Sequence, residues 1–136
     1  MKLWVIFCAV LLSGCIPYPV NKTLQPEAEI AVNDGNGKPV AGARVHLISS
    51  AYPYGFEKSR AEAQTDRAGR ASFAKVKEWR MEALMIHGAE VYFWNWCVEK
   101  ESYETHITSW GNGDDFRSRY EVALQPGVST SCNIGF

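Results

Sequence analysis

The sequence lacks an apolar run long enough to cross a bilayer as a helix. Its longest uninterrupted run extends from Leu3 to Leu12, whereas a membrane-spanning helix needs about 20 apolar residues. A run of this length at the N-terminus, preceded by a positive charge, fits the apolar region of a secretory signal. The alternative is a buried N-terminal helix or strand.

Short catalytic motifs are also missing. The sequence has no phosphate-binding loop, no Gly-x-Ser-x-Gly turn and no His-Glu-x-x-His segment. His46, His87 and His106 lie on separate segments, so a three-histidine metal site would require the fold to gather them. Asp114 and Asp115 lie in a glycine-rich loop, where solvated acids are a simpler interpretation than catalysis or calcium binding. We therefore predict a protein that is not an enzyme and that uses no metal or other cofactor.

An excess of charge of one sign is absent as well. Lys and Arg number 14 and Asp and Glu number 15, which gives a formal net charge of −1 at pH 7. Both signs are mixed along the chain, as on an ordinary solvated surface. We predict that nucleic acid is not a partner.

The N-terminal residues carry the most specific motif. Lys2 and the apolar run are followed directly by Leu12-Ser13-Gly14-Cys15. Small residues let an extended backbone enter a peptidase cleft, and the Cys15 thiol is a nucleophile that can accept a diacylglyceryl group. This tetrapeptide resembles the lipobox of bacterial lipoproteins. The resemblance implies that residues 1–14 are a cleaved signal peptide and that covalent lipid on Cys15, with palmitate-type acyl chains, anchors the protein to a membrane.

The residue after Cys15 bears on the destination. In many lipoproteins of this type an Asp at that place retains the protein in the inner membrane, and here the residue is Ile16. The resemblance therefore implies an outer-membrane protein that faces the periplasm. The inner membrane and the cell surface stay open as alternatives.

Cysteine usage agrees with export. Cys8 would leave with the signal and Cys15 would carry lipid, so Cys97 and Cys132 remain as an even pair in an oxidising compartment. We predict that they form a disulfide. Two buried free thiols are the alternative.

Prolines dominate the residues that follow the lipidation site. Pro17, Pro19 and Pro26 lie among polar residues and disfavour a helix. We interpret residues 15–26 as the lipidated N-terminus and a tether, and residues 27–136 as one domain.

That domain is patterned as short strands. Apolar and polar residues alternate over 28–33, 43–47 and 71–76, and turn-forming residues fill 34–37 and 66–69. Further strands are predicted over 61–65, 90–99, 103–110 and 120–124. The pattern predicts an all-β fold, a β-sandwich of about seven strands. Residues 77–87 are ambiguous, because helix-favouring residues there also alternate; a short helix or irregular crossover is predicted.

Several of these segments resemble a carboxypeptidase regulatory-like domain. The match runs through Val32–Leu47, Thr65–Phe73 and the closing segment Tyr120–Pro126. Glu101–Glu104 stands where the family often has a Gly-Tyr pair, and Ser102 departs from it. The resemblance implies a transthyretin-like Greek-key β-sandwich. It specifies a fold and very little function, because its motifs are turns and core positions.

The segment Val91–Val98 has the highest density of aromatic residues. Side chains alternate across a strand, so the segment has two faces. One face, the Trp face, carries Tyr92, Trp94, Trp96 and Val98. The other face carries Val91, Phe93, Asn95 and Cys97. Either the Trp face presents its rings to a partner, or it forms the core while the Cys97–Cys132 tail and the Trp79 region cover the other face. We favour the core, and keep as candidate binding residues Tyr92, Trp94, Trp96 and Trp110, with the Tyr52–Phe56 loop next.

These features together predict a membrane-anchored, non-enzymatic lipoprotein that binds a protein partner in the cell envelope. A component of a secretion machine and an immunity protein that neutralises a toxin are both compatible roles. The alternative is a carbohydrate- or peptidoglycan-binding module that uses the aromatic strand.

Overall fold

The computed structural model describes residues 17–83 and 89–133, and none of these residues is helical. The strands are, in chain order, β1 (Pro17–Gln25), β2 (Ala28–Asp34), β3 (Arg44–Tyr52), β4 (Glu57–Gln64), β5 (Arg70–Phe73), β6 (Val76–Ala83), β7 (Val91–Glu99), β8 (His106–Ile107) and β9 (Arg119–Leu124). The predicted all-β class is confirmed. In the described part of the chain there is no helix with the length and apolarity needed to cross a membrane.

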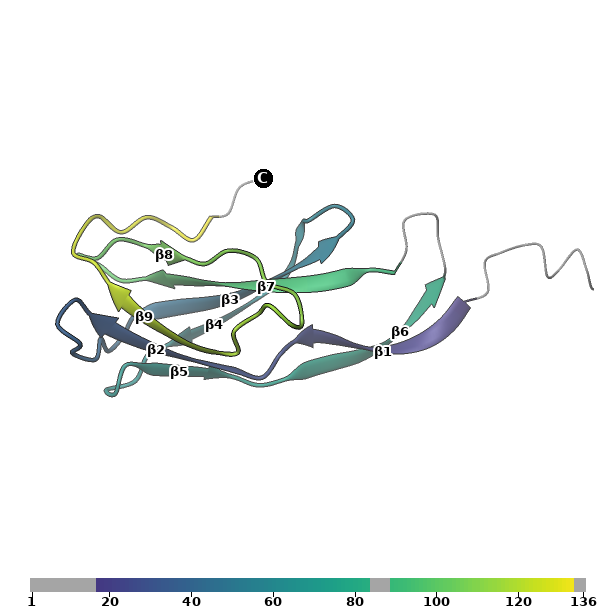
Figure 1. Ribbon diagram of the computed structural model, residues 1–136, viewed down its shortest axis with the longest axis horizontal. Helices are drawn as coiled ribbons and strands as arrows, with labels where there is room; N and C mark the ends of the chain where they lie inside the picture. The colour runs from purple at the N-terminus through teal and green to yellow at the C-terminus, as the bar shows by residue number, and fades with distance from the viewer. Residues whose placement is uncertain (1–16, 84–88, 134–136) are drawn as a thin grey trace, which may run out of the picture.

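The strands form two larger sheets and one two-stranded ribbon. The larger sheets have the orders β5-β2-β9 and β4-β3-β7-β8, and the ribbon consists of β1 and β6. The β2–β9 pair is parallel, and the other strand pairs of the described residues are antiparallel. In Figure 1 the two larger sheets form the body of the molecule, and the ribbon continues the course of β2 and β5 beyond it.

One apolar core joins the two larger sheets. Along β2, Ala28, Ile30 and Val32 are buried while the residues between them are partly exposed, as alternation predicts. The core also includes Val45 and Leu47 of β3, Trp94, Trp96 and Val98 of β7, and Val122 and Leu124 of β9. Apolar burial of this kind is the main favourable contribution to folding.

The two predicted turns are confirmed, and in each an Asp carboxylate accepts backbone hydrogen bonds from residues in or directly after the turn. The Asp34 carboxylate accepts backbone hydrogen bonds from Asn36 at 2.8 Å and Lys38 at 2.9 Å, and these bonds lower its pKa below 3.8. Asp66 accepts two in the same way across the second turn. Gly69 has φ +72°, and a Cβ there would lie 2.5 Å from the Val32 carbonyl oxygen. Only glycine fits that close approach.

The predicted tether is a strand from Pro17 onward. Residues Pro17–Gln25 form β1 and pair with β6, with Pro17 opposite Ala83. The prolines are tolerated because β1 has a partner on one side only, so a missing amide donor breaks no second ladder. The prediction of an unpaired spacer is therefore wrong for these residues, and residues 15 and 16 lie outside the described residues.

The predicted helix over 77–87 is also wrong as far as the structure describes it. Residues up to Ala83 belong to β6, and 84–87 lie outside the described residues. The alternation of Trp79 and Met81 was the correct signal. Pairing with β1 satisfies the backbone groups along one edge of β6, and this tertiary contact overrides helix propensity.

The segment predicted as a strand over 103–110 contains only the short strand β8. Ser102 precedes it with φ +70°, a left-handed conformation that favours glycine. This is the position at which the family resemblance expects a glycine. Outside β8, Tyr103 forms a single bridge with Pro126, and the Thr108 amide donates a hydrogen bond to the Trp96 carbonyl oxygen at 3.0 Å. Gly111, which follows the segment, forms a bridge with Trp94.

Candidate functional site

The predicted aromatic face of β7 is buried. Trp96 is 1% exposed, and Trp94 and Tyr92 are each 6% exposed. The Trp94 indole Nε1 donates a hydrogen bond to the Leu24 carbonyl oxygen at 2.9 Å, and Trp96 Nε1 donates one to the carbonyl oxygen of Arg117 at 3.1 Å. Tyr92, Trp94 and Trp96 are therefore core residues, as the favoured interpretation expected, and the alternative in which they form an exposed binding face is wrong.

The opposite face of β7 is covered by the C-terminal segment. The predicted disulfide between Cys97 and Cys132 is confirmed, with a sequence separation of 35. The two sulfurs pack with Ile48 in a second small core cluster, against which the partly buried Trp110 lies. Trp79 takes no part in this cover, because its side chain is 70% exposed.

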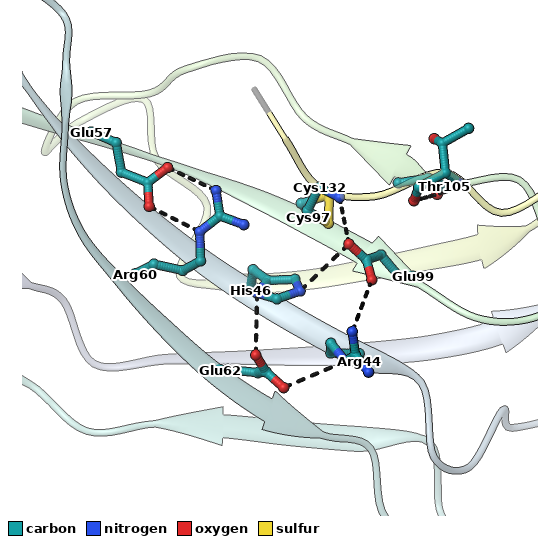
Figure 2. A network of polar contacts seen from close by, with 10 residues as sticks. Arg44, His46, Glu57, Arg60, Glu62, Cys97, Glu99, Thr105 and Cys132 are labelled. Carbon is teal, nitrogen blue, oxygen red and sulfur yellow. Dashed lines mark hydrogen bonds and ion pairs between the residues drawn. A yellow bond between two sulfur atoms is a disulfide. The ribbon is translucent and has the colours of Figure 1, made fainter. Parts of the chain in front are cut away.

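A polar network surrounds His46 beside this disulfide (Figure 2). His46 is opposite Cys97 in the β3–β7 register. Its Nδ1 lies 3.8 Å from a Glu62 carboxylate oxygen and its Nε2 lies 3.7 Å from Glu99. Arg44 contacts both carboxylates at 3.4 Å. Glu99 also accepts a hydrogen bond from the backbone amide of Cys132, so the network connects β3, β4, β7 and the C-terminal segment.

Burial decides the protonation of His46. The residue is 5% exposed, and neither ring nitrogen has a hydrogen-bond partner. Burial lowers the pKa of His46 below its ordinary 6.5, and the negative charge of Glu99 acts in the opposite direction. A neutral imidazole near neutral pH follows, because removal of the charged form from water is unfavourable.

His46, Glu99 and Cys132 form the metal-ligand cluster that the described residues contain, with ligand atoms within 4.8 Å of one another. However, Cys132 is bonded to Cys97, and a metal requires a thiolate rather than a disulfide sulfur. In its oxidised form the arrangement is therefore an electrostatic link that holds the C-terminal segment against β7.

His106 and the acids of the glycine-rich loop lie outside this network. His106 Nε2 lies 3.0 Å from the Tyr120 hydroxyl and the two rings stack; burial lowers the pKa of His106. His87 lies outside the described residues. Asp114 and Asp115 are exposed in the loop before β9.

A shallow cavity of about 490 Å³ lies beside His106. Aromatic and charged side chains line it together, among them Trp110, Phe116, Tyr120, Asp115 and Arg117. Of the four sequence candidates, Trp96 and Trp110 line this concavity, and Trp96 is almost completely buried while Trp110 is partly exposed. The Trp110 ring also packs edge-on against Phe93, with the ring centroids 5.1 Å apart.

Exposed aromatic rings gather instead at the tip of the β3–β4 hairpin. We call Tyr52–Phe56 the hairpin tip. Tyr54 is 72% exposed and Phe56 is 61% exposed, and their rings stack with centroids 6.1 Å apart. Tyr52, also exposed, lies opposite the exposed Val91 in the β3–β7 register. The sequence analysis ranked this loop below the aromatic strand as a candidate binding site.

Sequence reasoning missed the His46 network and the exposed Trp79 and Met81 of the ribbon. His46 had a weak signal, because it is a polar residue between the apolar residues Val45 and Leu47 of β3. Which side chains surround it depends on the register of three strands, and the sequence does not give that register.

Comparison of the chain with protein-family models, with curated proteins and with solved structures found no match.

Proposed function

We propose that this protein is a non-enzymatic lipoprotein, anchored by lipid on Cys15, that binds a protein partner in the cell envelope through the hairpin tip. The observation that carries the binding role is the pair of stacked, exposed rings of Tyr54 and Phe56. Residues 1–14 are the signal in this proposal. The outer membrane, facing the periplasm, is the proposed location.

The hairpin tip has the physical properties of an interface anchor. Aromatic side chains provide much of the binding energy in protein interfaces, and rings that are already ordered lose little entropy on binding. The tip extends from β3, whose residues Val45 to Ala51 are buried, so a rigid strand supports it. Arg60 pairs with Glu57 beside the tip at 2.7 Å and adds a polar rim.

The finer fold is part of the same proposal. We infer a transthyretin-like Greek-key sandwich of the carboxypeptidase regulatory-like type. Support comes from the Asp34 and Asp66 turns, which fall within the two motif segments, and from the positive φ of Ser102 at the expected glycine. Domains of this kind are mostly accessory or binding modules, which agrees with a role in a secretion machine or as an immunity protein.

The lipid anchor is tested on the protein made in its own cells. We expect the mass of the isolated protein to correspond to residues 15–136 plus acyl chains, and the protein to fractionate with the membrane. The Cys15→Ser variant should lose both properties. A wild-type protein that keeps residues 1–14, or that carries no lipid, would contradict the anchor.

The partner site is tested by crosslinking in intact cells followed by mass spectrometry. The double variant Tyr54→Ser/Phe56→Ser should lose a specific envelope protein that the wild type captures. Val128→Ser is the matched control, because Val128 is 82% exposed and lies outside the tip. Equal capture by both variants would exclude the tip as the binding surface.

Glycan binding is the second candidate, and the cavity beside His106 is the observation that favours it. Aromatic faces such as Trp110 stack on sugar rings, and Asp115 and Arg117 offer hydrogen-bonding groups to hydroxyls. Sedimentation with purified peptidoglycan tests it: the wild type should cosediment and Trp110→Ala should remain soluble. No cosedimentation of the wild type would remove this candidate.

A further inference from the structure

The two faces of the β1–β6 ribbon differ in character. Residues opposite one another in an antiparallel pair lie on the same face, so the register assigns each residue to a side. One side, the inner face, contacts the start of β7: Arg80 donates to the Tyr92 hydroxyl at 2.9 Å, and Lys22 donates to the Glu90 carbonyl oxygen. The other side, which we call the outer face, has no such contact with the body among the described residues.

The outer face is apolar at one end and polar at the other. Its paired residues are Pro17 with Ala83, Pro19 with Met81, Asn21 with Trp79, and Thr23 with Lys77. Trp79 is 70% and Met81 is 65% exposed, which is unusual for large apolar side chains on a two-stranded ribbon. The acidic residues Glu78 and Glu82 alternate to the inner face, where Glu82 pairs with Lys22. The outer face therefore carries no carboxylate.

The apolar end is the end nearest the lipidation site. Only Ile16 separates Cys15 from Pro17, so the chain places Pro17 within about 7 Å of Cys15 and Pro19 within about 14 Å. Met81 is directly opposite Pro19. Apolarity on the outer face thus falls with distance from the proposed anchor, and the cation Lys77 follows at the polar end.

We propose that the outer face of the ribbon, centred on Trp79 and Met81, lies on the lipid bilayer surface. This inference rests on the proposed lipid on Cys15. Tryptophan partitions to the zone between lipid head groups and acyl chains, where its ring is apolar and its N–H remains hydrogen-bonded. A face without carboxylates also avoids repulsion by anionic lipids, and Lys77 can approach a lipid phosphate.

The proposed contact gives the lipoprotein a fixed orientation. A ribbon that lies along the bilayer holds the body of the molecule beside the membrane, instead of leaving it free to swing on the acylated cysteine. The hairpin tip, on β3 and β4, is a separate surface and stays available for a protein. The ribbon is thus the membrane-facing element, in addition to the acyl chains.

Fluorescence quenching in vesicles tests this contact. The acylated, full mature protein is reconstituted in phosphatidylethanolamine–phosphatidylglycerol vesicles whose acyl chains are brominated, and in matched vesicles without bromine. Trp79 emission is isolated as the difference between the wild type and Trp79→Phe, because Trp94, Trp96 and Trp110 are present in both proteins. We expect the Trp79 difference emission to shift to shorter wavelength and to lose most of its intensity with bromine.

A matched control places a tryptophan at the other end of the molecule. Val128→Trp in the Trp79→Phe background should give emission that bromine leaves unchanged, because the C-terminal segment lies away from the ribbon (Figure 1). Quenching of Trp79 with no quenching at position 128 supports the inference. Equal emission of Trp79 in both kinds of vesicle overturns it, and so does equal quenching at the two positions.

The same preparation distinguishes a ribbon that does not contact the bilayer from a protein that carries no lipid anchor. Flotation of the vesicles and the mass of the protein report whether lipid is present on Cys15. A protein that is acylated and floats, yet shows unquenched Trp79, contradicts the membrane-facing ribbon and leaves the lipoprotein proposal intact. A protein without acyl chains contradicts the proposed anchor, and the ribbon inference that rests on it falls as well.

Discussion

Strands β7 and β6 carry the same kind of pattern and have opposite fates. Both place large apolar side chains at alternate positions, Trp94 and Trp96 in β7 and Trp79 and Met81 in β6. Trp96 is nevertheless 1% exposed, whereas Trp79 is 70% exposed. The difference lies in what faces each strand. β7 is central in a four-stranded sheet that packs on a second sheet, whereas β6 has only β1 beside it. Whether a tryptophan is buried or exposed therefore depends on whether a second sheet packs against its face of the strand. The residue pattern of the strand does not show whether such a sheet is present.

The largest expected effect is at Trp96. Trp96→Ala should lower the free energy of unfolding by about 3–5 kcal/mol, because it empties a large volume in a close-packed core. The measurement is urea denaturation of the purified protein. Trp79→Ala is the matched control and should change stability by no more than about 0.5 kcal/mol. Similar losses in both variants would contradict the comparison between the strands.

The disulfide is expected to contribute nearly as much. Replacing both Cys97 and Cys132 by Ala opens a loop with a sequence separation of 35, and the chain-entropy model predicts a loss of about 4 kcal/mol. Denaturation midpoints of the variant and of the reduced wild type measure this. A variant as stable as the oxidised wild type would show that the C-terminal segment holds without the crosslink.

Acidification should lower the free energy of unfolding, because His46 is buried. Its pKa in the folded protein is lowered from 6.5 by burial, so below pH 6.5 the unfolded chain takes up a proton that the folded protein resists. The contribution of His46 to the free energy of unfolding therefore has its full value above pH 6.5. It falls as the pH drops below 6.5, by at most about 1.4 kcal/mol per pH unit for this one group.

His46→Gln isolates that contribution, since His106 is retained and has a pKa lowered in the same direction. The stability of the variant should fall less steeply between pH 6.5 and pH 5 than that of the wild type. Parallel curves would mean that His46 is neutral or charged to the same extent in both states.

The smallest effect on global stability is expected in the ribbon. Lys22→Met removes the ion pair with Glu82 and the contact with the Glu90 carbonyl oxygen. It should change the global free energy of unfolding by about 1 kcal/mol or less, because the pair lies in the ribbon, outside the apolar core, and the ribbon can open separately. The amides of β1 and β6 should nevertheless exchange faster with solvent, because the ribbon can open without the core. Native-state hydrogen exchange measures both. Unchanged exchange in the ribbon would indicate that other contacts hold it.

Part of this arrangement could be predicted because it is local. Alternation predicted the strand β2, aromatic and branched residues predicted β7, and the turn-forming residues of 34–37 and 66–69 predicted the turns at Asp34 and Asp66. The candidate site was predictable only in part: the pairing of Cys97 with Cys132 followed from there being two such cysteines, and a core position was the favoured interpretation of the Trp face of β7, whereas the network around His46 was not predicted. The Tyr52–Phe56 loop was recognised as aromatic, but its exposure and stacking depend on its place at the end of a hairpin.

The sequence by itself determined the all-β class, the turns, the available cysteine pair and the motif at Cys15, because each depends on neighbouring residues or on residue type. Tertiary structure alone decided that Pro17–Gln25 is a strand, that β6 replaces a helix, and that His46 is enclosed by Glu62 and Glu99. These outcomes require partners far away in the chain. Burial and strand pairing are properties of the assembled sheets. A local residue pattern shows which side chains share a face of a strand, but it does not show what packs against that face.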